Sequence, residues 1–221
     1  MRAGGLNRSK GLNSKIGCVL DIDFRKADVV ADQYFMDRSA YGHRCQRKAD
    51  AHWHLDGWDF DGTGDYVDVT DLTTDLSGDG DFTADVLIKS ASQTNIMHIL
   101  SQSHTVDPYA SDWIFGGSIL GEALWMRSVT IAQPSGFDGR IWHYLAMAWD
   151  KSAGTYKGYL DSNALGVSGS VAGYGGVSSV KVGSRGDGTL SFYNGKIGKV
   201  RLYNLAEYAA RILQRAIRSR N

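Results

Sequence analysis

The sequence contains little of several residue types and patterns that would place it in a class at once. Cysteine occurs twice in 221 residues, at Cys18 and Cys45, so both thiols are expected to be free, and a disulfide between them is left open. No run reaches about 18 apolar residues, so no membrane insertion is expected. The N-terminus lacks the apolar segment of a secretory signal peptide, so we expect synthesis in a reducing cytosol. Proline occurs twice against 27 glycines, so turns should depend on residues that tolerate positive φ.

Residues that would support catalysis are equally scarce. Glutamate occurs only at Glu122 and Glu207, in unrelated contexts, whereas a glycoside hydrolase needs two carboxyl groups about 5–10 Å apart in one cleft. The glycine-rich loops that hold phosphates or dinucleotides and the Gly-x-Ser-x-Gly nucleophile motif are absent as well. We therefore predict that the chain is not an enzyme.

What the sequence has in abundance is alternation of apolar and polar residues with a period of two. Two short alternating runs, 58–60 and 66–69, flank a Gly-Thr-Gly turn, and the same succession of strand, glycine turn and strand continues to residue 203. Such alternation is typical of half-buried strands in antiparallel sheets. The length fits one domain, so we predict an all-β, two-sheet antiparallel β-sandwich. The expected strands lie at 20–24, 58–60, 66–69, 82–89, 96–100, 113–115, 124–126, 142–149, 155–160, 180–182 and 199–203, with loops at 37–43 and 166–176.

Charge is balanced overall but distributed unevenly along the chain. Residues 1–16 carry a charge of +4, residues 207–221 carry +3, and the body between them carries −7. Basic ends on an acidic body suggest a partner that binds the ends. The alternative, that charged termini only keep the protein in solution, is left open. The cations expected to bind an assembly are Arg2, Arg8, Lys10, Lys15, Arg211, Arg215 and Arg218.

The last residues change from the period of a strand to that of a helix. Apolar residues recur every three to four positions, which predicts a helix over 205–221 that docks on the body through one face. Its three arginines, Arg211, Arg215 and Arg218, should form a stripe on the opposite, outward face. The chain is thus divided into an extended basic arm at 1–16, a sandwich domain at 17–204 and a short basic amphipathic helix at 205–221.

Several short stretches, in this order, resemble laminin G-like and concanavalin A-like jelly-roll domains of the lectin and glucanase type. The resemblance implies a jelly roll whose first and last strands are neighbours, with a non-catalytic role in adhesion, glycan binding or assembly. Such domains also look common among the structural proteins of tailed phages. The matching stretches are Val19–Phe24, Asp37–Ser39 with Gly42, Phe60–Val67, Gly80–Val86, Trp142–Asp150, Gly158–Asp161 and Val200–Asn204.

Neighbouring end strands would place opposite charges side by side. Outward Asp21 and Asp23 on the first strand should face outward Lys199 and Arg201 on the last strand. Each such pair contributes only about 0.2–1 kcal/mol to stability. The larger consequence is geometric, because both basic ends would then leave from one side of the body and form one basic patch.

The resemblance also implies where a structural calcium ion would lie. Many relatives hold calcium between the loop that matches Asp37 and an acid just before the last strand. Calcium needs six to eight oxygen ligands, and here Lys199 stands close to the position of that acid. Calcium at Asp37 is left open, and no cofactor is predicted. Zinc-binding side chains lie near one another in sequence, but their spacing fits no zinc pattern: they are His43, Cys45, His52 and His54.

Two functions are consistent with these features. The first is a structural or decoration protein that docks on a phage capsid or tail, with the virion as its location. The alternative is a free glycan-binding lectin or adhesion module that uses Tyr109, Trp113 and Tyr174 as sugar platforms, although packing roles for these aromatic residues are left open. Sequence-specific binding of nucleic acid is not expected, because the body is acidic and carries no nucleic-acid-binding motif. Self-association of the chain is left open.

Overall fold

The structure is a computed structural model, in which part of the chain is described. The basic arm 1–16 and the proposed sugar platforms Tyr109, Trp113 and Tyr174 lie outside the described residues. The described residues are 17–26, 29–30, 33–54, 56–72, 80–91, 96–103, 114–118, 123–126, 129–132, 139–161, 163–168, 179–186, 188–207 and 209–219.

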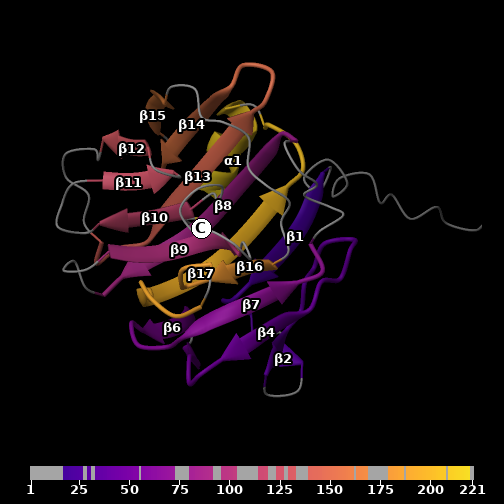
Figure 1. Cartoon of the computed structure of the whole chain (residues 1–221), viewed down its shortest axis with the longest axis vertical. Helices are drawn as coiled ribbons and strands as arrows, with labels where there is room; N and C mark the ends of the chain where they lie inside the picture. The colour runs from indigo at the N-terminus through magenta and orange to yellow at the C-terminus, as the bar shows by residue number, and fades with distance from the viewer. Residues whose placement is uncertain are drawn as a thin grey trace, which may run out of the picture.

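Two antiparallel sheets face each other, as predicted (Figure 1). In sheet A the long last strand β17 has β8 on one edge, while β6 and β1 share its other edge. Sheet A runs in the order β15 (Asn163–Ser168), β14 (Thr155–Leu160), β13 (His143–Asp150), β8 (Phe82–Ser90), β17 (Asn194–Tyr203), β6 (Gly57–Asp61) and β5 (His52–His54), with β1 (Cys18–Asp23) beside β17. Sheet B runs in the order β12 (Val129–Ala132), β11 (Ala123–Met126), β10 (Ile114–Ser118), β9 (Ile96–Ser103), β16 (Ser179–Val182), β7 (Tyr66–Thr70), β4 (Cys45–Lys48), β3 (Tyr34–Phe35) and β2 (Val29–Val30).

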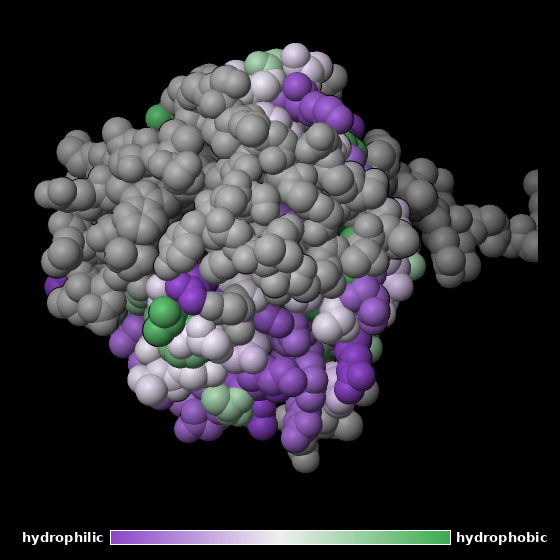
Figure 2. Space-filling model, in the orientation of Figure 1, coloured by the Kyte–Doolittle hydropathy of each residue, from purple (hydrophilic) through white to green (hydrophobic). Residues whose placement is uncertain are grey.

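Alternation produces the expected half-buried strands in sheet B. In β7 the side chains of Val67 and Val69 are fully buried, and Asp68 between them points outward to the ammonium group of Lys181 on β16. Figure 2 shows hydrophilic residues gathered over β4 and β7, which form this outer face of sheet B. One face of sheet B therefore meets the core, and the other meets solvent at these strands.

The core between the sheets is rich in aromatic side chains. Phe35 contacts Phe24 and Trp58 edge to face, with ring centres 4.9 Å and 4.5 Å apart. Trp149 packs on Tyr156 across β13 and β14, with ring centres 4.4 Å apart. Such contacts add to the burial of large apolar surfaces, so this layer supplies most of the stability of the sandwich.

The central strands of sheet A are buried on both faces because the C-terminal helix covers the outer one. Helix α1 (Ala209–Ser219) lies on β13, on the side away from sheet B (Figure 1). Ile212 and Ala216 are buried there in a second apolar cluster, which includes Tyr144 of β13 and Leu87 of β8. Among the described residues no helix is long and apolar enough to cross a membrane.

The predicted helix is correct in kind but too long at its start. Leu205 and Glu207 precede the helix, and both are held by the side chain of Thr83 on β8. The hydroxyl of Thr83 donates to the carbonyl oxygen of Leu205 at 2.8 Å and accepts from the amide of Glu207 at 2.9 Å. These bonds hold residues 205–207 in a non-helical connection that leads the chain from β17 to α1.

A basic pocket where the body's two ends meet

The first and last strands of the sandwich are neighbours, as the resemblance to jelly-roll domains implies. Asp21 lies opposite Arg201, and Asp23 lies opposite Lys199, in the antiparallel pair of β1 and β17. The carbonyl oxygen of Gly17 accepts a hydrogen bond from the amide of Asn204 at 2.9 Å. The body of the sandwich therefore begins and ends at the same place.

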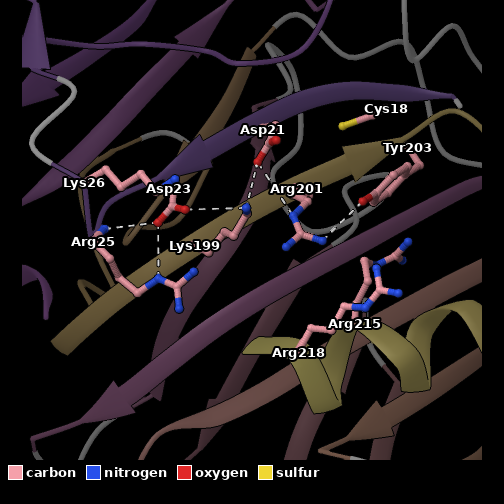
Figure 3. A pocket seen from close by; sticks show the side chains of 10 residues that line it. All are labelled: Cys18, Asp21, Asp23, Arg25, Lys26, Lys199, Arg201, Tyr203, Arg215 and Arg218. Carbon is pink, nitrogen blue, oxygen red and sulfur yellow. Dashed lines mark hydrogen bonds and ion pairs between the residues drawn. The ribbon is translucent and has the colours of Figure 1, made fainter. Parts of the chain in front are cut away.

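A row of alternating charges crosses the outer face of sheet A from β1 to α1, and Figure 3 shows all of its members except Asp85 and Glu207. Asp21 contacts two cations of β17, at 3.3 Å from the Nζ of Lys199 and 3.6 Å from the Nε of Arg201. At the far end of the row, the Nε of Arg215 lies 2.9 Å from the Oδ2 of Asp85 on β8. We call these eight side chains the charge row; in spatial order they are Arg25, Asp23, Lys199, Asp21, Arg201, Asp85, Arg215 and Glu207.

The acids of the charge row are buried, although they lie on the outer face of the sheet. Asp85 is 1% exposed, and Asp21, Asp23 and Glu207 are each buried as well. The pairing of the end strands was predicted correctly. The contacts between their charged side chains, however, were expected to be exposed surface pairs. Removing one partner of a buried pair leaves an uncompensated charge and costs several kcal/mol, far more than the loss of a surface pair.

The predicted outward stripe of arginines is only partly correct. Arg211 and Arg218 are exposed, whereas the side chain of Arg215 is 11% exposed and lies against the sheet. Its guanidinium group contacts Asp85 and Glu207 and lies 4.4 Å from the ring centre of Tyr203. Residue 215 follows the buried Ile212 by three positions, so it stands at the border of the buried helix face, where two acids and an aromatic ring hold it.

The charge row also shifts the pKa values of its members. Burial alone raises the pKa of Asp23, but the hydrogen bond from Arg25 and the charge of Lys199 outweigh it, so the pKa lies below 3.8. Burial lowers the pKa of Lys199 and raises that of Glu207, each in spite of its partners of opposite charge. Burial lowers the pKa of Arg215, but the carboxylate of Asp85 together with Tyr144 and Tyr203 outweighs it, so the pKa is raised. Opposite charges thus outweigh burial at Asp23 and Arg215, whereas burial outweighs them at Lys199 and Glu207.

A pocket of about 380 Å³ opens beside the charge row, between β1, β17 and α1. Six of its lining side chains are cationic and two are acidic. Lys26 and Arg218 are exposed. The Nη2 atom of Arg215 is buried and has no hydrogen-bond partner among the described residues. Figure 3 shows the lining residues, which are Cys18, Asp21, Asp23, Arg25, Lys26, Lys199, Arg201, Tyr203, Arg215 and Arg218.

Sequence reasoning missed this pocket as a unit. The sequence predicts cations at Arg215 and Arg218 of the helix and four charges on the end strands. It does not predict that these side chains line one pocket. Lys26 and Arg25 carried no signal of their own. The position of these two residues directly after the first strand could have indicated that they would lie near its partner strand.

In the described structure, the carboxylate of Asp37 accepts hydrogen bonds from its own loop and from β1. Its Oδ1 accepts from the amides of Asp21 and Ser39, both at 2.9 Å. Its Oδ2 accepts from the hydroxyl of Ser39 at 2.7 Å and from the amide of His43 at 2.9 Å. Four donors thus occupy the carboxylate and tie the loop to β1, so the geometry gives calcium at Asp37 no support.

The structure does not bring the candidate zinc ligands together, but it does bring three acids together. Cys45 belongs to β4 of sheet B and His43 lies in the loop just before it, whereas His52 and His54 are exposed on the edge strand β5 of sheet A, so the four do not form one group. Among the described residues, one group of acids lies close enough to hold a cation: Asp50, Asp61 and Asp65. Asp65 accepts hydrogen bonds from the amides of Asp50 and Asp61, at 3.1 Å and 3.0 Å, and so closes the turns on both sides.

Comparison with known proteins identifies the fold. No family model and no curated protein sequence matches the chain. A solved structure of Trypanosoma rangeli sialidase in complex with 2,3-difluorosialic acid aligns with a TM-score of 0.69 and 14% identity, over 92% of this chain and 33% of the sialidase. A structure of botulinum neurotoxin type C, whose cell entry depends on interaction with two ganglioside molecules, aligns with a TM-score of 0.67 and 12% identity, over 93% and 52%. The binding domain of botulinum neurotoxin DC, in complex with rat synaptotagmin II, aligns with a TM-score of 0.62 and 10% identity, over 91% and 51%.

These similarities define the class of the fold. The chain spans about a third of the sialidase and about half of the toxin chains. At identities this low the similarity shows the fold alone: a two-sheet β-sandwich. The particular form seen here is an antiparallel jelly roll with one short C-terminal helix on the outer face of sheet A.

Proposed function

We propose that this chain is a non-catalytic binding module that docks on a larger assembly through its two basic ends. The observation that carries the proposal is the hydrogen bond between Gly17 and Asn204, because it places the start and the end of the body side by side. The basic arm before Gly17 and the basic helix after Asn204 then act on the same partner. Two weak basic segments that bind together hold a partner much more tightly than either does alone.

The specific role that we propose is that of a structural or decoration protein of a tailed-phage capsid or tail, located in the virion. The acidic body keeps the sandwich away from an acidic partner, while the basic ends are drawn to it. The jelly roll would then face outward from the assembly. A non-catalytic role is supported by the absence of any catalytic motif in the sequence and by the scarcity of glutamate.

Deletion of residues 1–15 tests the docking role. The truncated chain should fold with unchanged thermal stability. It should no longer co-sediment with phage capsids or tails that are assembled in its presence. A matched variant that replaces Arg2, Arg8, Lys10 and Lys15 with glutamine keeps the length of the arm and isolates its charge. Unchanged incorporation of both variants would overturn the proposal.

A second candidate function is that of a free glycan-binding lectin. It is favoured by the shared fold with a toxin described as depending on two ganglioside molecules for cell entry. The residues proposed to stack on sugars are Tyr109, Trp113 and Tyr174. On a glycan array, Trp113→Ala or Tyr109→Ala should remove a binding signal that survives in Tyr41→Ala, a matched change at an exposed tyrosine elsewhere in the chain. An array without any signal for the unmodified chain would exclude this function.

A further inference from the structure

We propose that the pocket between β1, β17 and α1 receives carboxylate side chains from an acidic protein segment of the docking partner. The proposal rests on the docking function above and names its contact site. The groups that would hold the carboxylates are the side chains of Lys26 and Arg218 together with the Nη2 of Arg215.

The first argument concerns which cations of the pocket lie outside the charge row. The charge row contains four acids and four bases, each next to an opposite charge, so the row is neutral as a whole. Lys26 and Arg218 line the same pocket but do not belong to the row. The electrostatic surplus of the pocket therefore lies in these two exposed cations, which are available to a negatively charged partner.

The second argument concerns hydrogen bonding. The Nη2 of Arg215 is buried without a hydrogen-bond partner among the described residues. Asp85 and Glu207 hold the same guanidinium through its Nε and Nη1 atoms, so the group is fixed in place before any partner arrives. A fixed guanidinium N–H forms a short, charge-assisted bond to a carboxylate and loses little entropy on binding.

The third argument concerns the shape and the surface of the pocket. A volume of about 380 Å³ admits one or two acidic side chains, and it is too small for a folded element. Tyr203 is the aromatic residue in the lining, and it is fully buried under the guanidinium group of Arg215. A sugar ring thus finds no exposed aromatic face in this pocket on which to stack.

The fourth argument excludes two other occupants. The arm of this chain, residues 1–16, carries four cations and no acid, so it is repelled by a basic pocket. A nucleic-acid backbone is bound by an extended track of cations that follows many phosphates. In this pocket only Lys26 and Arg218 of the lining cations lie outside the charge row, and two cations suit a short acidic peptide segment better than an extended backbone of phosphates.

The test uses the full chain and a fluorescein-labelled oligoglutamate peptide, with oligoglutamine as the neutral control peptide. Fluorescence anisotropy should show salt-sensitive binding of oligoglutamate and none of oligoglutamine. The double variant Lys26→Gln/Arg218→Gln should bind oligoglutamate about tenfold more weakly, since two exposed ion pairs are lost. The matched variant Lys151→Gln/Lys157→Gln removes two exposed cations away from the pocket and should bind as the unmodified chain does. All four positions are exposed, so the thermal stability of both variants should be unchanged.

Each other outcome overturns the proposal. Equal weakening in both double variants would mean that overall charge attracts the peptide. Unchanged binding in Lys26→Gln/Arg218→Gln would mean that the pocket does not hold carboxylates. Tighter binding of a short DNA duplex, with the same dependence on Lys26 and Arg218, would reassign the pocket to phosphate groups.

Co-sedimentation with particles separates this proposal from the docking function. Docking that is lost on neutralising the arm but kept in Lys26→Gln/Arg218→Gln would overturn the pocket as a docking contact and leave the docking function standing. Peptide binding that depends on the pocket, combined with co-sedimentation that no variant alters, would overturn the docking function and leave the pocket as an acidic-peptide site.

Discussion

The Nε of Arg215 on the C-terminal helix lies 2.9 Å from the Oδ2 of Asp85 on β8; the side chain of Asp85 is buried, and that of Arg215 is 11% exposed. This contact joins two segments that are far apart in the sequence. It fixes the helix on the outer face of sheet A and positions the helix cations at the pocket. The stability of the helix and the shape of the proposed binding site therefore depend on the same ion pair.

Replacement of Asp85 with asparagine should destabilise the protein by about 3 kcal/mol. The change leaves Arg215 and Arg201, which are largely covered, with one negative neighbour fewer, and each keeps a second acid, which limits the loss. Urea denaturation measures the effect. The matched change Asp81→Asn, at an exposed acid just before β8, should alter stability by less than about 0.5 kcal/mol. An equally small effect at both positions would show that the buried row contributes no more than a surface pair.

The apolar side of the same helix can be tested independently of charge. Ile212 is fully buried against sheet A, whereas Ile217 on the same helix is 61% exposed. Ile212→Ala should cost about 2–5 kcal/mol, because it leaves a cavity between α1 and β13. Ile217→Ala makes the same chemical change in the same helix and should stay within about 0.5 kcal/mol in urea denaturation. Equal costs would mean that α1 does not depend on packing against the sheet.

The sandwich itself was predictable, since a period of two in the sequence directly reflects which face of a strand is buried. Val67 and Val69 with Asp68 between them illustrate this, and the structure places them as expected. The short strand β5, His52–His54, gave no such signal, because all three of its side chains are exposed. Strand β15 begins before the glycine-rich stretch that predicted a loop and extends into it, since pairing with β14 extends its edge. Pairing of this kind depends on neighbours that no local pattern contains.

The candidate site was predictable only in pieces. The resemblance to jelly-roll domains predicted that Asp21 and Asp23 would face Arg201 and Lys199, and the register confirms it. Helical periodicity alone could not place Arg215, because it gives angles around the helix axis but not the charges of the surface beneath. Asp85 supplies that charge from a distant strand, and it draws Arg215 out of the predicted stripe.

Acid should weaken the protein partly through Asp23. The pKa of Asp23 lies below its usual value of 3.8 in the folded protein, so its ionised form stabilises the fold above that pH. This contribution is lost as pH falls through the lowered pKa. The difference in unfolding free energy between the unmodified chain and Asp23→Asn should be constant above about pH 5 and should shrink towards about pH 2 in urea denaturation.

Asp65 provides the comparison for this pH effect, because its pKa is shifted the other way. Burial raises the pKa of Asp65 above 3.8, and the hydrogen bond from the amide of Asp61 only partly offsets it. Ionisation of Asp65 therefore costs stability, and the cost is relieved as pH falls. The difference between the unmodified chain and Asp65→Asn should rise with falling pH, opposite to the trend for Asp23→Asn. Trends of the same sign would contradict both assignments.

The start of β17 requires a residue without a side chain. Gly195 has φ of +142°, and a Cβ atom there would lie 2.4 Å from the carbonyl oxygen of Lys89 on β8. Gly195→Ala should therefore cost at least about 2–3 kcal/mol in urea denaturation, because the backbones of β8 and β17 must separate. Gly154 also has a positive φ, of +63°, but a Cβ atom there meets nothing within 4 Å. Gly154→Ala should thus show the backbone strain alone, about 1 kcal/mol. The excess cost at position 195 then combines the close approach of the strands with a φ that alanine adopts less readily, and equal costs would mean that neither constrains position 195.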